Sequence, residues 1–157
     1  MKLIPLSSSQ FAKVDDWWFE YLNQWIWTAQ WAEHIQGYYA QRSEGPRNNS
    51  KVIMMHRVVA KTPDGMICDH INHETLNNQE HELRNVTRSQ SQMNIGVMKN
   101  NKLGVKGVTK RTNRDRYIAT LYLDKKLVFK KEFKTIEEAK QAREKAEIKY
   151  FGEFRKK

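Results

Sequence analysis

The sequence contains one cysteine, Cys68, and no apolar run long enough to cross a membrane as a helix. A lone cysteine excludes an intramolecular disulfide and a zinc site built from cysteines. The first residues also lack a basic segment followed by an apolar stretch and a cleavage site, which a secretory signal would have. We therefore expect a soluble protein that has no membrane partner and stays in the reducing cytoplasm.

An excess of positive charge is missing from the first two thirds of the chain. The ten Lys and Arg residues before Lys102 are balanced by ten Asp and Glu residues, so the whole formal charge of +10 lies from Lys102 onward. All five tryptophans lie between Trp17 and Trp31. The two asymmetries predict two modules that meet near residues 97–102, the second of which binds a polyanion.

The N-terminal part has the residue pattern of a small β-rich unit with one helix. Apolar and polar residues alternate over short segments that are separated by turn-forming residues. Asp15 and Asp16 precede a group of aromatic residues and could cap the helix that carries them. The expected elements are strands at 11–14, 26–31 and 38–42, a turn at 34–37, a loop at 43–50, a buried strand or helix at 52–59, a turn at 62–65 and a strand at 66–69.

The C-terminal part predicts three strands and a helix. The strands are expected at residues 105–110, 117–123 and 127–133. Thr135 and Glu138 have the spacing of a capping box, which begins a helix, and Gly152 is placed to end it. Ala139, Ala142 and Ala146 mark one helical face and would let the helix lie close to the sheet. The predicted fold class is α+β, with a three-stranded antiparallel sheet packed on one helix.

The residues with the clearest chemistry lie toward the end of the first part. Asp69 and His70 end an apolar run, a polar loop follows, and a short apolar segment after Glu82 leads into an expected helix. A carboxylate can hold a hard divalent cation beside a phosphodiester, and a histidine can accept a proton from the attacking water. Neighbouring side chains point to opposite faces of a regular strand, so both serve one phosphate only where the strand ends.

In its first 94 residues the chain resembles the HNH endonucleases of the phage and intron-encoded homing type. The resemblance implies a ββα-metal motif after the β-rich unit, with Asp69 binding Mg²⁺ or Mn²⁺ and His70 as general base. The segments that carry it are Ile4-Pro5-Leu6, Val14-Asp15-Asp16, Gly37-Tyr38-Tyr39-Ala40, Met55-His56-Arg57 and Asp69-His70-Ile71-Asn72.

Two positions depart from that family. An asparagine that braces the catalytic hairpin is usual where this chain has Glu82, and an asparagine metal ligand is usual where it has Ser91. We expect Glu82 to brace the hairpin through its carboxylate and Ser91 to complete the metal site, with Asn94 one turn further as a substitute. The alternative is a catalytically impaired DNA-binding regulator or accessory protein on the same fold.

Residues 104–154 resemble the ethylene-response-factor (APETALA-type) DNA-binding domain, in which a three-stranded sheet enters the major groove and a helix backs it. The segments that carry this likeness are Gly104-Val105-Lys106-Gly107-Val108, Tyr117-Ile118-Ala119-Thr120-Leu121, 133–139 and Ile148-Lys149-Tyr150-Phe151-Gly152. Alternation puts Tyr117, Ala119, Leu121 and Leu123 on the helix side. The expected DNA-contacting residues are Lys106, Thr109, Arg111, Arg116, Thr120, Tyr122 and Phe129.

The remaining expectations concern single residues and assembly. His56 is expected to be a hydrogen-bonded structural histidine, His73 and His81 loop residues, and the tryptophans core. The expected domains are 1–96 for the nuclease-like part and 104–157 for the DNA-binding part, joined by a linker at 97–103. We expect double-stranded DNA as partner, no small-molecule cofactor, and a monomer or weak dimer in a bacterium or phage-infected bacterium.

Overall fold

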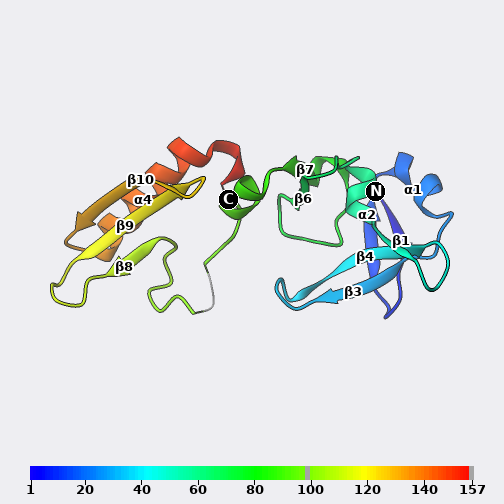
Figure 1. Cartoon of the computed structure of the whole chain (residues 1–157), viewed down its shortest axis with the longest axis horizontal. Helices are drawn as coiled ribbons and strands as arrows, with labels where there is room; N and C mark the ends of the chain where they lie inside the picture. Colours follow the sequence, from blue (N-terminus) through cyan, green and yellow to red (C-terminus); the bar gives the residue numbers. More distant parts are fainter. Residues whose placement is uncertain (98–99, 156–157) are drawn as a thin grey trace. The chain divides into compact units, whose positions relative to one another are not determined.

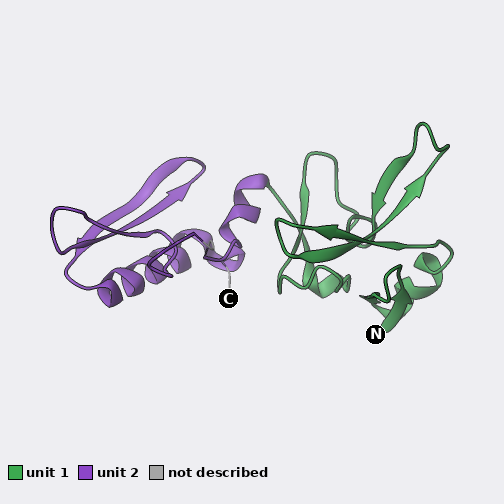
Figure 2. Cartoon of the chain, turned by 90° about the horizontal axis from the view of Figure 1, so that it is seen from below, with its two compact units in different colours: residues 1–87 green, residues 88–157 purple. Residues whose placement is uncertain are grey.

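The computed structural model describes residues 1–97 and 100–155 and confirms the α+β class (Figure 1). Its contacts divide the chain into two compact units, Met1–Thr87 and Arg88–Lys157, which Figure 2 colours separately. The division falls before the expected end of the first domain at residue 96. Of the expected linker 97–103, Met98 and Lys99 lie outside the described residues. Within the described ranges, no helix is long and apolar enough to span a membrane.

The first unit consists of small antiparallel sheets and short helices. Two are hairpins, β1–β2 and β6–β7, and the third is a three-stranded sheet in the order β3–β4–β5. The elements are β1 (Lys2–Pro5), β2 (Phe11–Val14), α1 (Asp16–Leu22), β3 (Thr28–Ala32), β4 (Gly37–Glu44), β5 (Lys51–Met54), α2 (Met55–Val59), β6 (Ile67–His70), the 3-10 turn η1 (Glu80–Glu82) and β7 (Leu83–Val86).

Strand pairing lengthens one expected strand of this unit. Strand β4 continues to Glu44, into the predicted loop, because Glu44 pairs with Lys51 of β5. The loop therefore begins at Gly45, whose φ of +98° suits glycine. The apolar segment 52–59 contains both structures that were expected as alternatives, since β5 ends at Met54 and α2 begins at Met55.

Aliphatic residues and one tryptophan form the core of the first unit. Ile4, Leu22 and Met55 are fully buried, and Trp27 is buried with its indole nitrogen donating to the Leu22 carbonyl at 2.8 Å. Trp17 is 69% exposed, so the expectation that the tryptophans form the core holds only for part of the cluster. Local aromatic density alone could not tell which ring the strands would cover.

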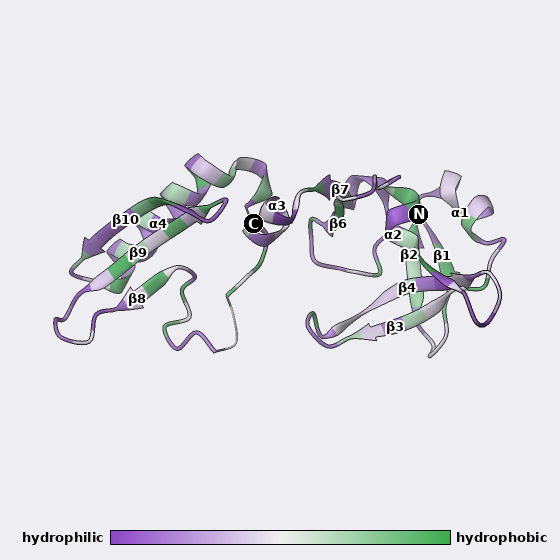
Figure 3. Cartoon of the chain, viewed as in Figure 1, coloured by the Kyte–Doolittle hydropathy of each residue, from purple (hydrophilic) through white to green (hydrophobic). Residues whose placement is uncertain are grey.

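The second unit confirms the predicted sheet and helix. Its sheet has the antiparallel order β10–β9–β8, and residues 117, 119, 121 and 123 of β9 face the helix side, where Ala119 and Leu121 are fully buried. Figure 3 shows hydrophobic segments in β8 and β9 and a hydrophilic end of β10. The elements are α3 (Arg88–Met93), β8 (Val108–Lys110), β9 (Tyr117–Leu123), β10 (Lys126–Phe133), α4 (Ile136–Phe151) and the 3-10 turn η2 (Gly152–Phe154).

Helix α4 begins and ends where the sequence predicts. The Thr135 hydroxyl accepts a hydrogen bond from the Glu138 amide at 3.2 Å, and the Glu138 carboxylate accepts one from the Thr135 amide at 3.3 Å. Gly152 follows the last helical residue with a φ of +53°. Ala139 and Ala146 are buried against the sheet, so the helix lies close to it.

Helix α3 belongs to the second unit. Met93 at its end is buried with Leu121, Ala146 and Phe151. The ammonium of Lys106 donates to the carbonyl oxygens of Met93 at 3.1 Å and Ile95 at 2.6 Å. Methionine packing and this lysine therefore attach α3 to the sheet-and-helix module, whereas the sequence grouped it with the nuclease-like part.

The close approach at Gly107 gives a test of the β8–β9 packing. Gly104 and Gly107 both have φ near +65°, but a Cβ on Gly107 would lie 2.7 Å from the Thr120 carbonyl oxygen and 2.4 Å from Arg143 Nε, and one on Gly104 meets nothing within 4 Å. We expect Gly104→Ala to cost about 1 kcal/mol of unfolding free energy and Gly107→Ala about 3 kcal/mol. Denaturant unfolding measures both, and equal losses would contradict the described packing.

Candidate functional site

The hairpin β6–β7 positions Asp69 and His70. In its register Asp69 lies opposite Arg84 and His70 opposite Leu83, and the Ile71 amide donates to the Glu82 carbonyl oxygen at 2.9 Å. The loop between the strands is held along β2, because the Lys13 amide donates to the Leu76 carbonyl at 2.9 Å and the Asn78 amide to the Lys13 carbonyl at 2.8 Å. The acid and the histidine thus end a strand whose following loop is fixed.

Asp15 anchors the same loop instead of capping α1. Its carboxylate accepts hydrogen bonds from the Glu80 amide at 2.7 Å and the Gln79 side chain at 3.2 Å, and it makes no side-chain cap bond to α1. The Trp18 indole nitrogen donates to the Glu80 carboxylate at 2.7 Å. Asp15 is the N-cap residue of α1, as expected, but its side chain does not cap the helix, because a partner more than sixty residues away outcompetes the local amides.

His70 is buried and uncharged at neutral pH. Burial lowers its pKa from 6.5 to about 4, while a hydrogen bond with the Asn78 side chain and the negative charge of Asp69 partly oppose this shift and His73 adds to it. Only 5% of the residue is exposed. A neutral imidazole can accept a proton.

Two aromatic side chains from other elements surround His70. The His56 ring from α2 lies 5.2 Å from the His70 ring, edge to face, and the Tyr39 ring from β4 lies 6.1 Å away. Burial, followed by the neighbouring His70 and Arg57, lowers the pKa of His56 to about 3. Burial, followed by the charges of Asp69 and Cys68, raises the pKa of Tyr39.

The sequence did not identify these neighbours as part of the site. Tyr39 and His56 stood in the segments of the family resemblance, which was their only signal. The expected hydrogen bond of His56 is not found at Nδ1, which is buried without a hydrogen-bond partner among the described residues. The His56 ring instead packs against the His70 ring.

Asp69 is held by a positive charge directly across the hairpin. Arg84 Nε and Nη2 both donate to Asp69 Oδ2, at 3.0 and 2.8 Å, and both side chains are largely buried. Charge-assisted bonds of this kind are among the stronger hydrogen bonds. A cation that binds Asp69 must therefore share the carboxylate with Arg84.

The donor set around Asp69 suits a hard cation with few protein ligands. A carboxylate oxygen is the ligand type that Mg²⁺ and Mn²⁺ prefer, and such ions commonly retain water and bind phosphate oxygens. Among the described residues, no three His, Cys, Asp or Glu side chains converge to hold a metal.

Glu82, Ser91 and His73 are the other residues that the sequence placed in or near this site. Glu82 closes the hairpin through its backbone carbonyl, and its carboxylate lies 3.6 Å from His81 Nε2. Ser91 lies in α3, within the second unit. His73 has a φ of +65° in the hairpin loop.

On the second unit, three of the residues expected to contact DNA share the sheet face that points away from α4. Thr109 is opposite Ile118 in the register, Thr120 is opposite Lys130, and Tyr122 is 58% exposed. Arg111 Nη1 lies 3.3 Å from Glu132 Oε2 beside this face. This set combines hydroxyl groups, an aromatic ring and cations on one side of the sheet.

The remaining expected DNA contacts are placed elsewhere. The register shifts between Leu127 and Phe129, so Phe129 pairs with Leu121 instead of Thr120 and packs against the core on the helix side. A bulge thus reverses the side on which Phe129 was expected. Lys106 is engaged by the carbonyls at the end of α3, and Arg116 lines a groove between β10 and α4.

Comparison of the chain with family models, with curated proteins and with solved structures found no match in any of the three.

The two buried histidines give a stability prediction. In the unfolded chain their pKa is near 6.5, whereas the folded values are about 3 and about 4, so the unfolded state binds more protons below pH 6.5. The contribution of the two neutral histidines to the free energy of unfolding is therefore complete above that pH, and it falls as the pH drops toward 4. His56→Phe should reduce the slope between about pH 5.5 and 4.5 by about 1.4 kcal/mol per pH unit.

Denaturant unfolding of the wild type and His56→Phe at a series of pH values measures that slope. The change between pH 7 and 8 serves as the control, because both histidines are then neutral in the folded chain and mostly neutral in the unfolded chain. An unchanged acid slope would show that His56 takes up its proton equally in the folded and unfolded chain.

Proposed function

We propose that this chain is a DNA-binding HNH-type endonuclease that hydrolyses phosphodiester bonds with one divalent metal ion, Mg²⁺ or Mn²⁺. The observation that carries the proposal is the buried, neutral His70 beside Asp69 at the end of a β-hairpin. Proton acceptor and hard metal ligand are the two groups that metal-assisted hydrolysis requires of a protein. We expect the protein to work in the cytoplasm of a bacterium or a phage-infected bacterium.

The residues of the hairpin have distinct parts in this chemistry. His70 takes the proton of the attacking water, and an anionic phosphate brought beside it raises its low pKa toward neutrality. Asp69 would hold the metal ion, which when bound would offset negative charge on the phosphate. His56 and Tyr39 exclude water from one side of the His70 ring and fix its orientation.

The second unit supplies affinity and register in this proposal. It carries the whole positive excess of the chain, and the face with Thr109, Thr120 and Tyr122 presents groups that can bind bases or phosphates. Each Lys or Arg that neutralises a phosphate steepens the salt dependence of binding by about one unit of log–log slope. A monomer with one hydrolytic site would nick one strand.

A plasmid assay tests the enzymatic part. We expect purified full-length protein to convert supercoiled plasmid to nicked circles with Mg²⁺ or Mn²⁺ and not with EDTA. Asp69→Asn should slow nicking by about 100-fold or more, because the metal loses its carboxylate. DNA binding, measured by gel shift, should stay near the wild-type level because the basic unit is unchanged.

Asp64→Asn is the matched control, since it removes an equal charge from an exposed turn in the same unit. Its nicking rate should equal that of the wild type. Wild-type protein that shifts DNA without cutting it under any metal would leave only the binding half of the proposal.

One observation favours the second candidate, a catalytically impaired HNH-fold regulator or accessory protein that binds DNA. The Asp69 carboxylate is neutralised by Arg84, and the chain has Glu82 and Ser91 where the resembling family has asparagines. In that case the Asp–Arg pair is a structural link between β6 and β7.

Removing the competing cation distinguishes the two candidates. If Asp69 is a metal ligand, Arg84→Gln should tighten Mn²⁺ binding by about threefold or more, because a like charge beside the ion is lost. Electron paramagnetic resonance of free Mn²⁺ measures this, with the exposed loop variant Arg47→Gln as control. Mn²⁺ binding that responds to neither Arg84→Gln nor Asp69→Asn would favour the accessory role.

A further inference from the structure

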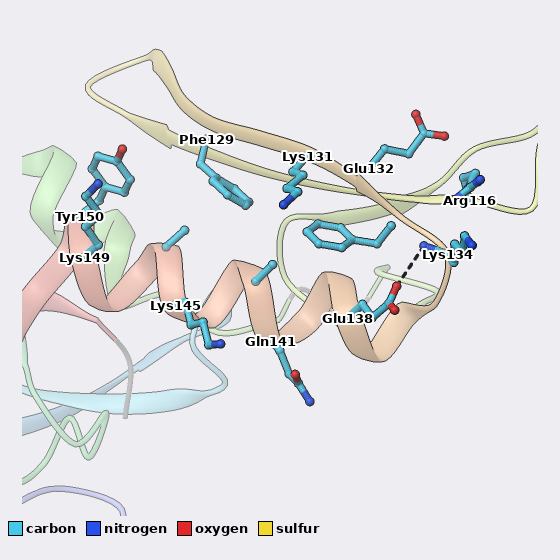
Figure 4. Close-up of a pocket in the computed structure, with 13 residues that line it drawn as sticks. Arg116, Phe129, Lys131, Glu132, Lys134, Glu138, Gln141, Lys145, Lys149 and Tyr150 are labelled. Atoms are coloured by element: carbon cyan, nitrogen blue, oxygen red, sulfur yellow. Dashed lines mark hydrogen bonds between the residues drawn. The ribbon is translucent and has the colours of Figure 1, made fainter.

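A groove of about 890 Å³ lies along the second unit between β10 and α4 (Figure 4). Its apolar lining consists of Phe129 and Phe133 from the strand and Ala142, Ala146 and Tyr150 from the helix. The two phenylalanines are half-buried and pack against the core, so their rings form the floor of the groove. The groove therefore offers apolar surface to an occupant.

Five cations line the groove. They do not form an ion pair with any residue that the structure describes. The two acids there are engaged elsewhere: Glu132 points away from α4 to Arg111, and Glu138 accepts the amides of Lys134 and Thr135 in the capping box. The cations are Arg116, Lys131, Lys134, Lys145 and Lys149.

Strand β10 has an open edge beside this groove. The sheet order is β10–β9–β8, so no described strand pairs with the second edge of β10. Opposite that edge, the helix residues that line the groove recur at helical spacing from Glu138 to Tyr150. A strand added to β10 would have one face over this stripe of α4, as a strand within a sheet would.

Lys131 decides which strand could be added there. It pairs with Ala119, which puts it on the helix side of β10 between Phe129 and Phe133. A charge that points inward on an edge strand discourages pairing with an ordinary apolar strand. An acidic residue on the incoming strand removes this penalty. Lys131 therefore disfavours an apolar strand and favours a strand with an acid at the facing position.

We propose that the groove binds an extended acidic segment of a partner protein, which adds to the edge of β10 as a fourth strand. Its inward residues, at every second position, are apolar, acidic and apolar, to match Phe129, Lys131 and Phe133. Flanking acids meet Lys134, Lys145 and Lys149. This binding site is separate from the proposed nuclease chemistry and does not depend on it.

The lining favours a peptide over a nucleic acid. A single-stranded nucleic acid would need aromatic faces on which bases stack. Phe129 and Phe133 instead pack into the core, and the Tyr150 and Phe133 rings have Lys149 and Lys131 ammonium groups 5.3 and 5.7 Å from their centres. An open strand edge with alternating side-chain positions matches the hydrogen-bonding repeat of a polypeptide.

Fluorescence anisotropy with full-length protein tests the proposal. The probe is a labelled peptide, Asp-Asp-Leu-Thr-Asp-Thr-Leu-Asp-Asp, whose leucines and central aspartate share one face of a strand. We expect Lys131→Glu to weaken its binding by about tenfold or more and a central lysine in the peptide to restore it. Lys130→Glu is the matched control, because Lys130 is the neighbouring exposed residue on the opposite face and the charge change is the same.

Two further measurements can overturn the proposal. The peptide Asp-Asp-Leu-Asp-Thr-Leu-Thr-Asp-Asp has the same composition with its leucines on opposite faces, and equal binding would reduce the groove to a basic surface. The same conclusion would follow if single-stranded DNA displaced the probe and both variants weakened DNA binding equally. Amide hydrogen exchange of β10 should slow with the peptide; binding without slowing would exclude strand addition.

Discussion

The antiparallel register of β6 and β7 is the constraint on which the candidate active site depends. It places Asp69 opposite Arg84 and brings the backbone of Glu82 to Ile71, so that His70 ends the strand and is buried. A shift by one residue would exchange the two faces of the strand and expose the imidazole. Burial of His70 in turn depends on α2 and β4, which supply His56 and Tyr39. The chemical state of one histidine thus rests on four elements.

Electrostatic balance differs between the two units. In the first, the principal acid of the site already has a cationic partner, so a metal ion or phosphate would have to rearrange an existing pair. In the second, the cations that line the groove between β10 and α4 form no ion pair with an acid among the described residues, so an anionic occupant would meet no such competition. A ligand of Asp69 would therefore have to displace Arg84, whereas an acidic ligand of the groove would displace no ion pair that the structure describes.

The register shift in β10 decides which face of the second unit the later residues of that strand join. Before the shift Leu127 lies opposite Tyr122, and after it Phe129 lies opposite Leu121. The shift turns Phe129, Lys131 and Phe133 toward α4 and leaves Lys130 and Glu132 on the opposite side. The irregularity between Leu127 and Phe129 therefore places the strand residues that line the groove on the helix side.

Features that depend on near neighbours were determined by the sequence alone. The capping box of Thr135 and Glu138, the stop at Gly152 and the alternation of β9 all follow from residues within a few positions of one another. Only tertiary structure decided that Asp15 binds the hairpin loop, that Arg84 holds Asp69, that α3 joins the second unit and that Phe129 faces inward. The first three are contacts between residues distant in the chain, in which a stronger or better-packed partner outcompetes the local choice. The fourth comes from a bulge in the β9–β10 hairpin, which the alternation of residue types does not reveal.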